Sequence, residues 1–175
     1  MPEIESNSEV FSTISKIALP MILSGFFVML AEQINFIYVA NLEQTELVVA
    51  VGLANMLINL FCFSITFGMN SALETLVSQA NGAGNKKLCG LWLNRARLGL
   101  VAVFPIIVFC LINTKYIIKG MFKASDEVAT AASNYVFALL PGLLYIVLFD
   151  MHKIFLNSMC HTIGPFVIQA MAVPL

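Results

Sequence analysis

The stretch that decides the fold is LVVAVGLANMLINLFCFSITFGMNSALETL, residues 47–76, an apolar run in which small polar residues recur at regular intervals. A helix needs about 20 predominantly apolar residues to cross the ~30 Å hydrocarbon core of a bilayer. This run is long enough, and Glu74 is its only charged residue. The sequence therefore predicts a transmembrane helix over residues 47–78.

The polar residues of this run share one helix face. At about 100° per residue, a set of small residues falls within an arc of roughly 80°, namely Asn55, Asn59, Cys62, Thr66 and Asn70. A polar side chain without a partner is costly in lipid, so such a stripe should face other helices or a water-filled cavity. We therefore predict that this helix lines a pathway, with Asn55, Asn59, Thr66 and Asn70 as candidate pathway residues.

The composition of the whole chain is that of a membrane protein. Hydrophobic residues make up 59% and charged residues 11% of the 175 residues, and the mean hydropathy is +0.90. In a soluble domain about a quarter of the residues are charged. The formal net charge is -1 and there is no basic stripe, which excludes the electrostatic footprint of nucleic-acid binding.

Sequence motifs for catalysis or metal binding are missing as well. The four cysteines are widely spaced without a C-x-x-C pair, which predicts small core residues and neither a zinc cage nor a disulfide framework. The sequence contains no G-x-S-x-G or H-E-x-x-H motif and no carboxylate pair spaced for hydrolysis. We therefore expect no enzymatic activity, no metal and no cofactor.

Further apolar segments complete the predicted fold, an all-α polytopic membrane protein with about four complete transmembrane helices and a truncated fifth. After a cytoplasmic tail over residues 1–16, the predicted helices cover residues 17–40, 47–78, 91–113, 129–151 and 162–175. Pro105 and Pro141 predict kinks, which neighbouring helices tolerate in a membrane. The fifth segment is too short to span the core, so the chain looks cut off within a helix.

The flanking basic residues predict the orientation. With the N-terminus inside, the cytoplasmic side receives Lys16, Lys86, Lys87, Arg95, Arg97 and Lys153. The opposite side receives Lys115, Lys119 and Lys123. This bias agrees with the excess of basic residues that cytoplasmic loops carry. The sequence does not distinguish the plasma membrane from a vacuolar or other internal membrane.

Glu32 is the only charged residue of the first predicted span. On a helical wheel it shares an arc with Ser24, Asn35 and Tyr38, and Glu32 and Asn35 are further candidate pathway residues. A carboxylate held near the middle of the bilayer would serve as a proton site. Alternatively, Glu32 lies near the outer mouth and is simply hydrated, because it follows Lys16 by many residues in a helix that rises ~1.5 Å per residue.

The second intramembrane carboxylate, Glu74, comes late in the second span, near the cytoplasmic loop. We expect it to form an ion pair with Arg95 or Arg97 on the next helix, which would close the inner end of the helices. Such a pair is a candidate inner gate, because it would break in one of the two conformations of a transport cycle.

In the fourth span, one helix face carries Asn134, Pro141 and Tyr145. Pro141 frees a backbone carbonyl one turn earlier, which offers a polar group to a cavity. Tyr145 is therefore a further candidate pathway residue, although a kink that only improves packing explains the proline equally well. Asp150 is expected to point the other way and to be hydrated near the inner interface.

Several short motifs in this chain carry a family resemblance. They are TEL at 45–47, VGLAN at 51–55, SALETL at 71–76, QANGAGN at 79–85, LWLNRA at 91–96 and LLPGL at 139–143. In this order and spacing they resemble the second, third and fourth helices of the multidrug and toxic compound extrusion (MATE) family. The second-helix motif is more similar to eukaryotic members than to bacterial ones.

The resemblance implies a secondary antiporter in the lipid bilayer, built of twelve helices in two lobes. Such a protein exchanges H+ or Na+ for organic cations or other metabolites, and this chain matches less than one lobe. The resemblance also implies that the eukaryotic members carry an acidic residue for coupling in the second lobe. Many bacterial members place an aspartate in the first helix where this chain has Asn35, which cannot carry a proton.

Two other functions remain open at this point. One is export of a lipid-linked oligosaccharide or polysaccharide by a member of the same superfamily, which would need a more basic cavity than Arg95 and Arg97 provide. The other is a non-transporting membrane protein that assembles with itself or with a full-length relative. The exporter would be recognised by a basic cavity, and the assembling protein by a defined oligomer.

Overall fold

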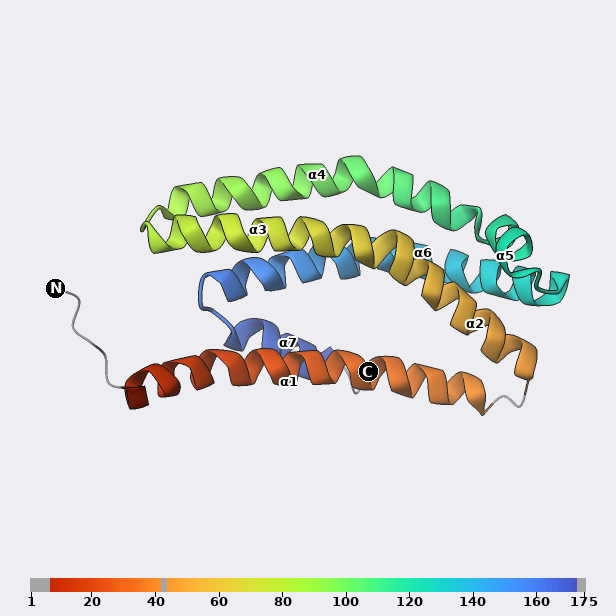
Figure 1. The fold of residues 1–175 in the computed structure, drawn as a ribbon, viewed down its shortest axis with the longest axis horizontal. Helices are drawn as coiled ribbons and strands as arrows, with labels where there is room; N and C mark the ends of the chain where they lie inside the picture. Colours follow the sequence, from red (N-terminus) through yellow and green to blue (C-terminus); the bar gives the residue numbers. More distant parts are fainter. Residues whose placement is uncertain (1–6, 42–43, 173–175) are drawn as a thin grey trace.

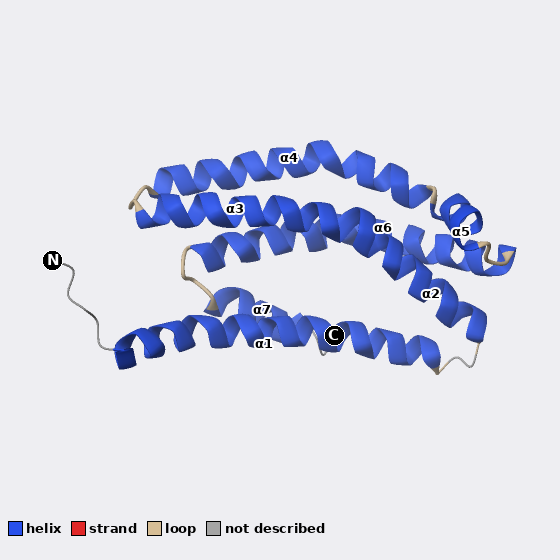
Figure 2. Cartoon of the chain, in the orientation of Figure 1, coloured by secondary structure: helices blue, strands red, loops and turns tan. Residues whose placement is uncertain are grey.

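A computed structural model describes residues 7–41 and 44–172. These residues form helices joined by short loops, without a strand in the described ranges (Figure 2). The elements are α1 (Asn7–Ala40), α2 (Thr45–Ile58), the π-helix η1 (Asn59–Phe63), α3 (Ser64–Gly82), α4 (Lys86–Ile112), α5 (Thr114–Phe122), α6 (Asp126–Ser158) and α7 (Ile163–Ala172).

Four helical stretches are long and apolar enough to cross a membrane, as the sequence predicted. They cover Val10–Ala40, Thr45–Gly82, Lys86–Ile112 and Asp126–Ser158. The second stretch runs through α2, η1 and α3 without a break (Figure 1). The shorter α7 lies where the fifth helix was expected. The all-α polytopic membrane fold is therefore confirmed.

The first helix begins earlier than predicted. Helix α1 starts at Asn7 and includes residues that we assigned to the tail over 1–16; residues 1–6 lie outside the described residues. No glycine or proline occurs between Asn7 and Lys16 to break the helix. Hydropathy marks where a helix becomes apolar, and here the helix itself starts before that point.

Capping residues and one glycine set the turns. Gly84 has φ +73°, in the region that glycine adopts without strain, just after the end of α3. The Asn85 side chain accepts a hydrogen bond from Leu88 N at 3.1 Å and so caps α4. Ser125 caps α6 by accepting from Val128 N at 3.3 Å. Helix α3 ends at Gly82, four residues beyond the predicted end at residue 78.

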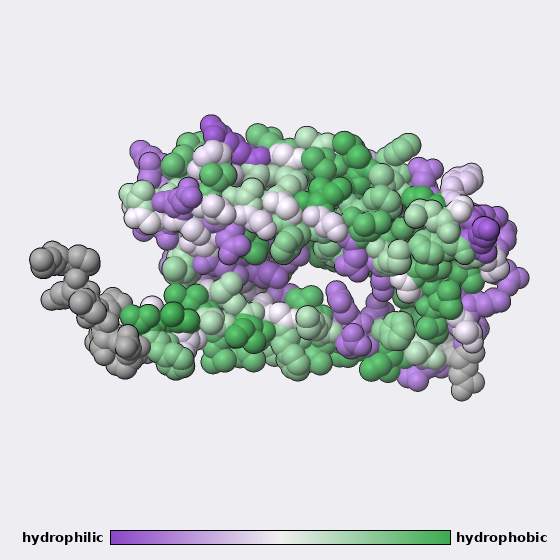
Figure 3. All heavy atoms as spheres, in the orientation of Figure 1, coloured by the Kyte–Doolittle hydropathy of each residue, from purple (hydrophilic) through white to green (hydrophobic). Residues whose placement is uncertain are grey.

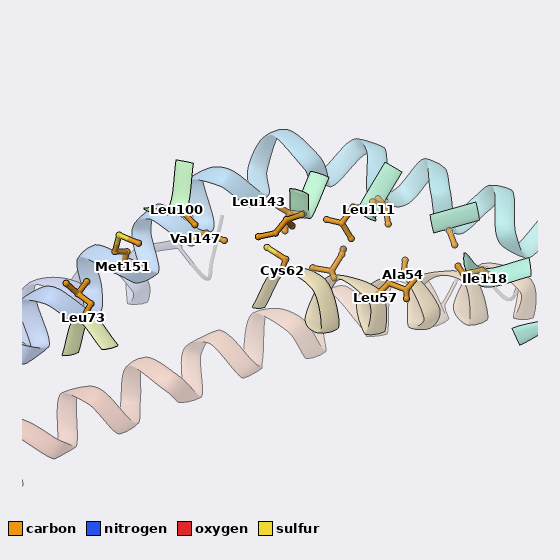
Figure 4. Close-up of a cluster of buried hydrophobic side chains, with 14 of the residues drawn as sticks. Ala54, Leu57, Cys62, Leu73, Leu100, Leu111, Ile118, Leu143, Val147 and Met151 are labelled. Atoms are coloured by element: carbon orange, nitrogen blue, oxygen red, sulfur yellow. The ribbon is translucent and has the colours of Figure 1, made fainter. Parts of the chain in front are cut away.

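The core lies between α2, α3, α4 and α6, where α6 packs against each of the other three. Figure 4 shows its buried side chains facing one another, among them Leu57, Leu100, Leu111, Val147 and Met151. Ala129 and Ala132 are fully buried on α6, and such small residues let helices approach closely in a membrane. Among the cysteines, Cys62 and Cys89 are core residues as predicted, whereas Cys160 is exposed.

Helices α1 and α7 form a second layer below this core (Figure 1). The Ser24 hydroxyl on α1 donates to Gln169 Oε1 on α7 at 2.6 Å. Phe27 and Phe166 pack nearby with ring centroids 6.1 Å apart. Beyond α7, α1 contacts mainly α2, at the far end of the molecule. Figure 3 shows the hollow that results between α1 and the helices above it.

The short helix α5 was not predicted. The sequence placed its residues in a connection on the outer side, because they are too few and too rich in lysine to span a membrane. In the structure Ile118 is buried, while Lys115 and Lys119 form ion pairs with Asp126 at the start of α6; the Lys115 Nζ–Asp126 Oδ1 distance is 3.5 Å. The connection is thus an ordered helix that contacts α6.

Candidate functional site

The hollow between the two layers is a cavity of about 620 Å³. Its walls come from α1, η1, α6 and α7. The lining residues are Phe27, Val28, Ala31, Glu32, Asn59, Phe63, Tyr145, Ile146, Phe149, Asp150, Ile168 and Gln169. A largely apolar, aromatic wall with a few polar groups is typical of a site for a small molecule.

The π-helix η1 explains how Asn59 reaches this cavity. A π turn adds a residue to the helix, so the residues after the turn are rotated relative to those before it. Asn59 opens η1 and lines the cavity, whereas Cys62 and Thr66 further along are buried in the core. Ser64 Oγ donates to the carbonyl of Asn59 at 3.0 Å, which satisfies one backbone group at the irregular turn. The predicted stripe is therefore divided between two faces.

Glu32 lines the cavity from α1 and is exposed to it. Among the ion pairs of the described residues, none involves Glu32. Its two roles, as a proton site or as a hydrated carboxylate, stay predictions.

Asp150 lines the same cavity from α6, so the prediction that it points away from the pathway was wrong. Its Oδ1 lies 3.0 Å from Lys153 Nζ, and the two side chains are 31% and 18% exposed. Helix α1 stands away from α6 at this level, and the cavity therefore takes in a broad sector of α6 that includes Tyr145 and Phe149. A single narrow stripe, which the helical wheel assumes, does not describe this face.

The remaining pathway candidates lie elsewhere. Asn35 Nδ2 donates to the Tyr135 hydroxyl at 3.2 Å, joining α1 to α6. The buried Thr66 hydroxyl donates to the carbonyls of its own helix turn at 3.0 and 3.1 Å. Asn55 and Asn70 are half-buried, and the Asn70 Oδ1 atom is buried without a hydrogen-bond partner among the described residues. The structure thus brings together Glu32, Asn59 and Tyr145 from the predicted set.

The expected ion pair of Glu74 with Arg95 or Arg97 is not found among the described residues. The Arg95 guanidinium lies over the Trp92 ring, 4.9 Å from its centroid. Arg97 instead contacts the Nε2 atom of His152 on α6 and donates to Asn94 Oδ1 at 3.2 Å. Both arginines therefore have other partners in this conformation, and Glu74 is exposed.

Sequence reasoning also missed the α7 side of the cavity. Gln169 and Ile168 come from the short last segment, which we did not include among the pathway candidates. A usable signal existed, because Ser24 and Gln169 are polar residues within apolar segments, and such residues seek one another in lipid.

Comparison with known proteins gives one family. The family profile named MatE matches residues 20–175. Multidrug and toxin extrusion protein 1 of Danio rerio is 36% identical over 129 residues, which cover 73% of this chain and 21% of that protein. Protein DETOXIFICATION 37 of Arabidopsis thaliana is 30% identical over 151 residues, covering 79% of this chain and 30% of that protein. No solved structure matches this chain.

Multidrug and toxin extrusion protein 1 of Homo sapiens is 34% identical over 125 residues, which cover 71% of this chain and 21% of that protein. The chain thus spans between about a fifth and a third of the length of these curated relatives.

Proposed function

Because this chain belongs to the MatE family, we propose that it is part of a secondary antiporter that exports organic cations or other metabolites and xenobiotics in exchange for H+ or Na+. Its four apolar helices make it an integral multi-pass membrane protein. The observation that carries the proposal is the cavity between α1 and α6, which we propose as a segment of the export pathway.

The chemistry of this cavity supports a cationic cargo with an apolar body. Its charged lining residues are the carboxylates Glu32 and Asp150, and most of the rest are apolar or aromatic. Aromatic faces attract organic cations, and Phe27, Phe149 and Tyr145 supply such rings. A carboxylate beside an apolar wall adds charge complementarity.

We propose coupling through Glu32, because it is the carboxylate of α1 that lines the cavity and it has no ion-pair partner among the described residues. A proton or Na+ bound there would neutralise one wall of the cavity. Coupling and cargo binding would then compete for the same charge, which is the basis of an antiport cycle.

Glu74, Arg95 and Arg97 remain our proposed inner gate, with the ion pair forming in the alternative transport conformation. Alternating access moves one group of helices against another, so contacts at the ends of the helices exchange partners. In a transport assay, Glu74→Arg and Arg95→Glu should each lower transport, and the double exchange should restore part of it. Equal loss in the double variant would refute the pairing.

The same cavity disfavours export of a lipid-linked oligosaccharide. The pyrophosphate of such a cargo is anionic and would need basic lining residues. The cavity instead presents Glu32 and Asp150.

Binding of a defined organic cation tests the proposal. The chain is purified into lipid nanodiscs, and saturable binding of radiolabelled tetraphenylphosphonium is measured. Ala31→Trp places a bulky ring in the cavity wall and should abolish binding, whereas Ala102→Trp on the exposed face of α4 should not. Absence of saturable binding, or binding insensitive to Ala31→Trp, would overturn the proposal.

A further inference from the structure

The ion pair of Asp150 with Lys153 borders the cavity but is only half inside it. Asp150 belongs to the lining, whereas Lys153 does not. We propose that Asp150 is a second counter-ion, besides Glu32, for the positive charge of the cargo, and that Lys153 is a built-in competitor that occupies Asp150 when no cation is bound. This inference rests on the proposed function and assigns a recognition role within it.

The local sequence separates the two sides of α6 at this level. Met151 is buried in the core, and His152 points to α4, where it contacts Arg97. Asp150 and Lys153, three residues apart, form an ion pair at the edge of the cavity, with Asp150 Oδ1 and Lys153 Nζ at 3.0 Å. Because Met151 faces the core and His152 faces α4, Asp150 is left on the cavity side of α6.

The pair leaves capacity for a second cation. A carboxylate has about four lone-pair sites, and Lys153 is the partner that the structure shows for it. The lysine chain reaches Asp150 from the next turn of the same helix, so it can move away without disturbing the helix. A bulky organic cation is held by the negative charge of the carboxylate and does not require a hydrogen bond from it. Nearby Phe149 and Tyr145 offer ring faces to the apolar body of the cation.

The opposing view is that Asp150 and Lys153 form an ordinary helix-stabilising pair. Pairs with this spacing stabilise a helix only slightly. In that case removing either partner would have the same small effect, and neither would alter cation binding. The competitor model predicts opposite signs for the two removals.

The experiment uses the full 175-residue chain in lipid nanodiscs with two probes, tetraphenylphosphonium and the neutral triphenylphosphine oxide. Asp150→Asn should weaken binding of the cation at least tenfold, and Lys153→Met should tighten it at least threefold, because Coulomb interaction at contact distance and an effective dielectric near 20 exceeds these factors. Binding of the neutral probe should stay within twofold in both variants. Asp126→Asn is the matched control, because it makes the same charge change in the ion pairs with Lys115 and Lys119. It should change the affinity for neither of the two probes.

Shifts of the same sign in Asp150→Asn and Lys153→Met, or cation affinity unchanged in both, would overturn the inference. If Asp150→Asn does not fold, the double variant Asp150→Asn/Lys153→Met replaces it, because the two substitutions together leave the net charge unchanged. This double variant should bind the cation more weakly than Lys153→Met alone. If Ala31→Trp blocks cation binding but Asp150→Asn leaves it unchanged, only this inference is refuted. Absence of saturable binding in the unmodified chain would refute both it and the proposed function.

Discussion

Arg97 on α4 lies against the Nε2 atom of His152 on α6. The other ring nitrogen, His152 Nδ1, is 2.6 Å from the carbonyl oxygen of Leu148. A carbonyl only accepts, so Nδ1 carries the hydrogen, and Nε2 accepts from the guanidinium. This tautomer makes the contact a charge-assisted hydrogen bond between two packed helices, in the part of α6 that borders the cavity.

Replacing His152 by leucine should lower the free energy of unfolding by about 1–3 kcal/mol, because it removes the acceptor of a half-buried charged donor. Thermal unfolding in detergent, followed by circular dichroism, measures this loss. Arg95→Leu is the matched control, since Arg95 is exposed and contacts Trp92 on its own helix, and it should cost less than about 1 kcal/mol. Equal losses of unfolding free energy in the two variants would show that the contact between Arg97 and His152 contributes no extra stability.

The π turn predicts different outcomes for two residues that a helical wheel places together. Asn59 lines the cavity, whereas the Thr66 hydroxyl bonds within its own helix. Asn59→Leu should therefore weaken tetraphenylphosphonium binding about three- to tenfold, by loss of a polar group from the wall. Thr66→Val keeps the buried shape and should leave binding within twofold. A larger effect at Thr66 than at Asn59 would contradict the divided stripe.

Length and hydropathy were enough to predict the four spanning helices, because an apolar run of sufficient length has few alternatives in a membrane. Glu32, Asn59 and Tyr145 were selected as polar residues in apolar segments, and all three line the cavity.

The remaining features depend on contacts that a single sequence does not reveal. A π turn at residues 59–63 leaves the hydrophobic pattern unchanged, so the change of face between Asn59 and Thr66 was not visible. Asp150 was misplaced because its exposure depends on how far α1 stands from α6. The cavity wall also includes α7, which meets α1 through Ser24 and Gln169, two residues far apart in the sequence.

The turn between α3 and α4 gives a prediction about backbone strain. Gly84 has φ +73°, and an added Cβ meets nothing within 4 Å, so the cost of Gly84→Ala is conformational and not steric with neighbours. The variant should lose about 1–2 kcal/mol of stability. Gly82→Ala, at a helical position with equally open surroundings, should be neutral or slightly stabilising. Equal thermal stability of the two variants would contradict this account.

The hydrogen bond between Ser24 and Gln169 should decide how firmly α7 closes the cavity. Ser24 is buried, and Ser24→Ala would remove the hydroxyl that donates to the side-chain oxygen Oε1 of Gln169 at 2.6 Å. Loss of such a bond costs about 1–2 kcal/mol, so amide hydrogen exchange over residues 163–172 should become about 5- to 30-fold faster. Ser12→Ala, on the exposed face of α1, is the matched control and should leave α7 unchanged. Unaltered exchange of α7 in Ser24→Ala would mean that packing of Phe27 on Phe166 holds the helix instead, and Phe166→Ala should then produce the acceleration.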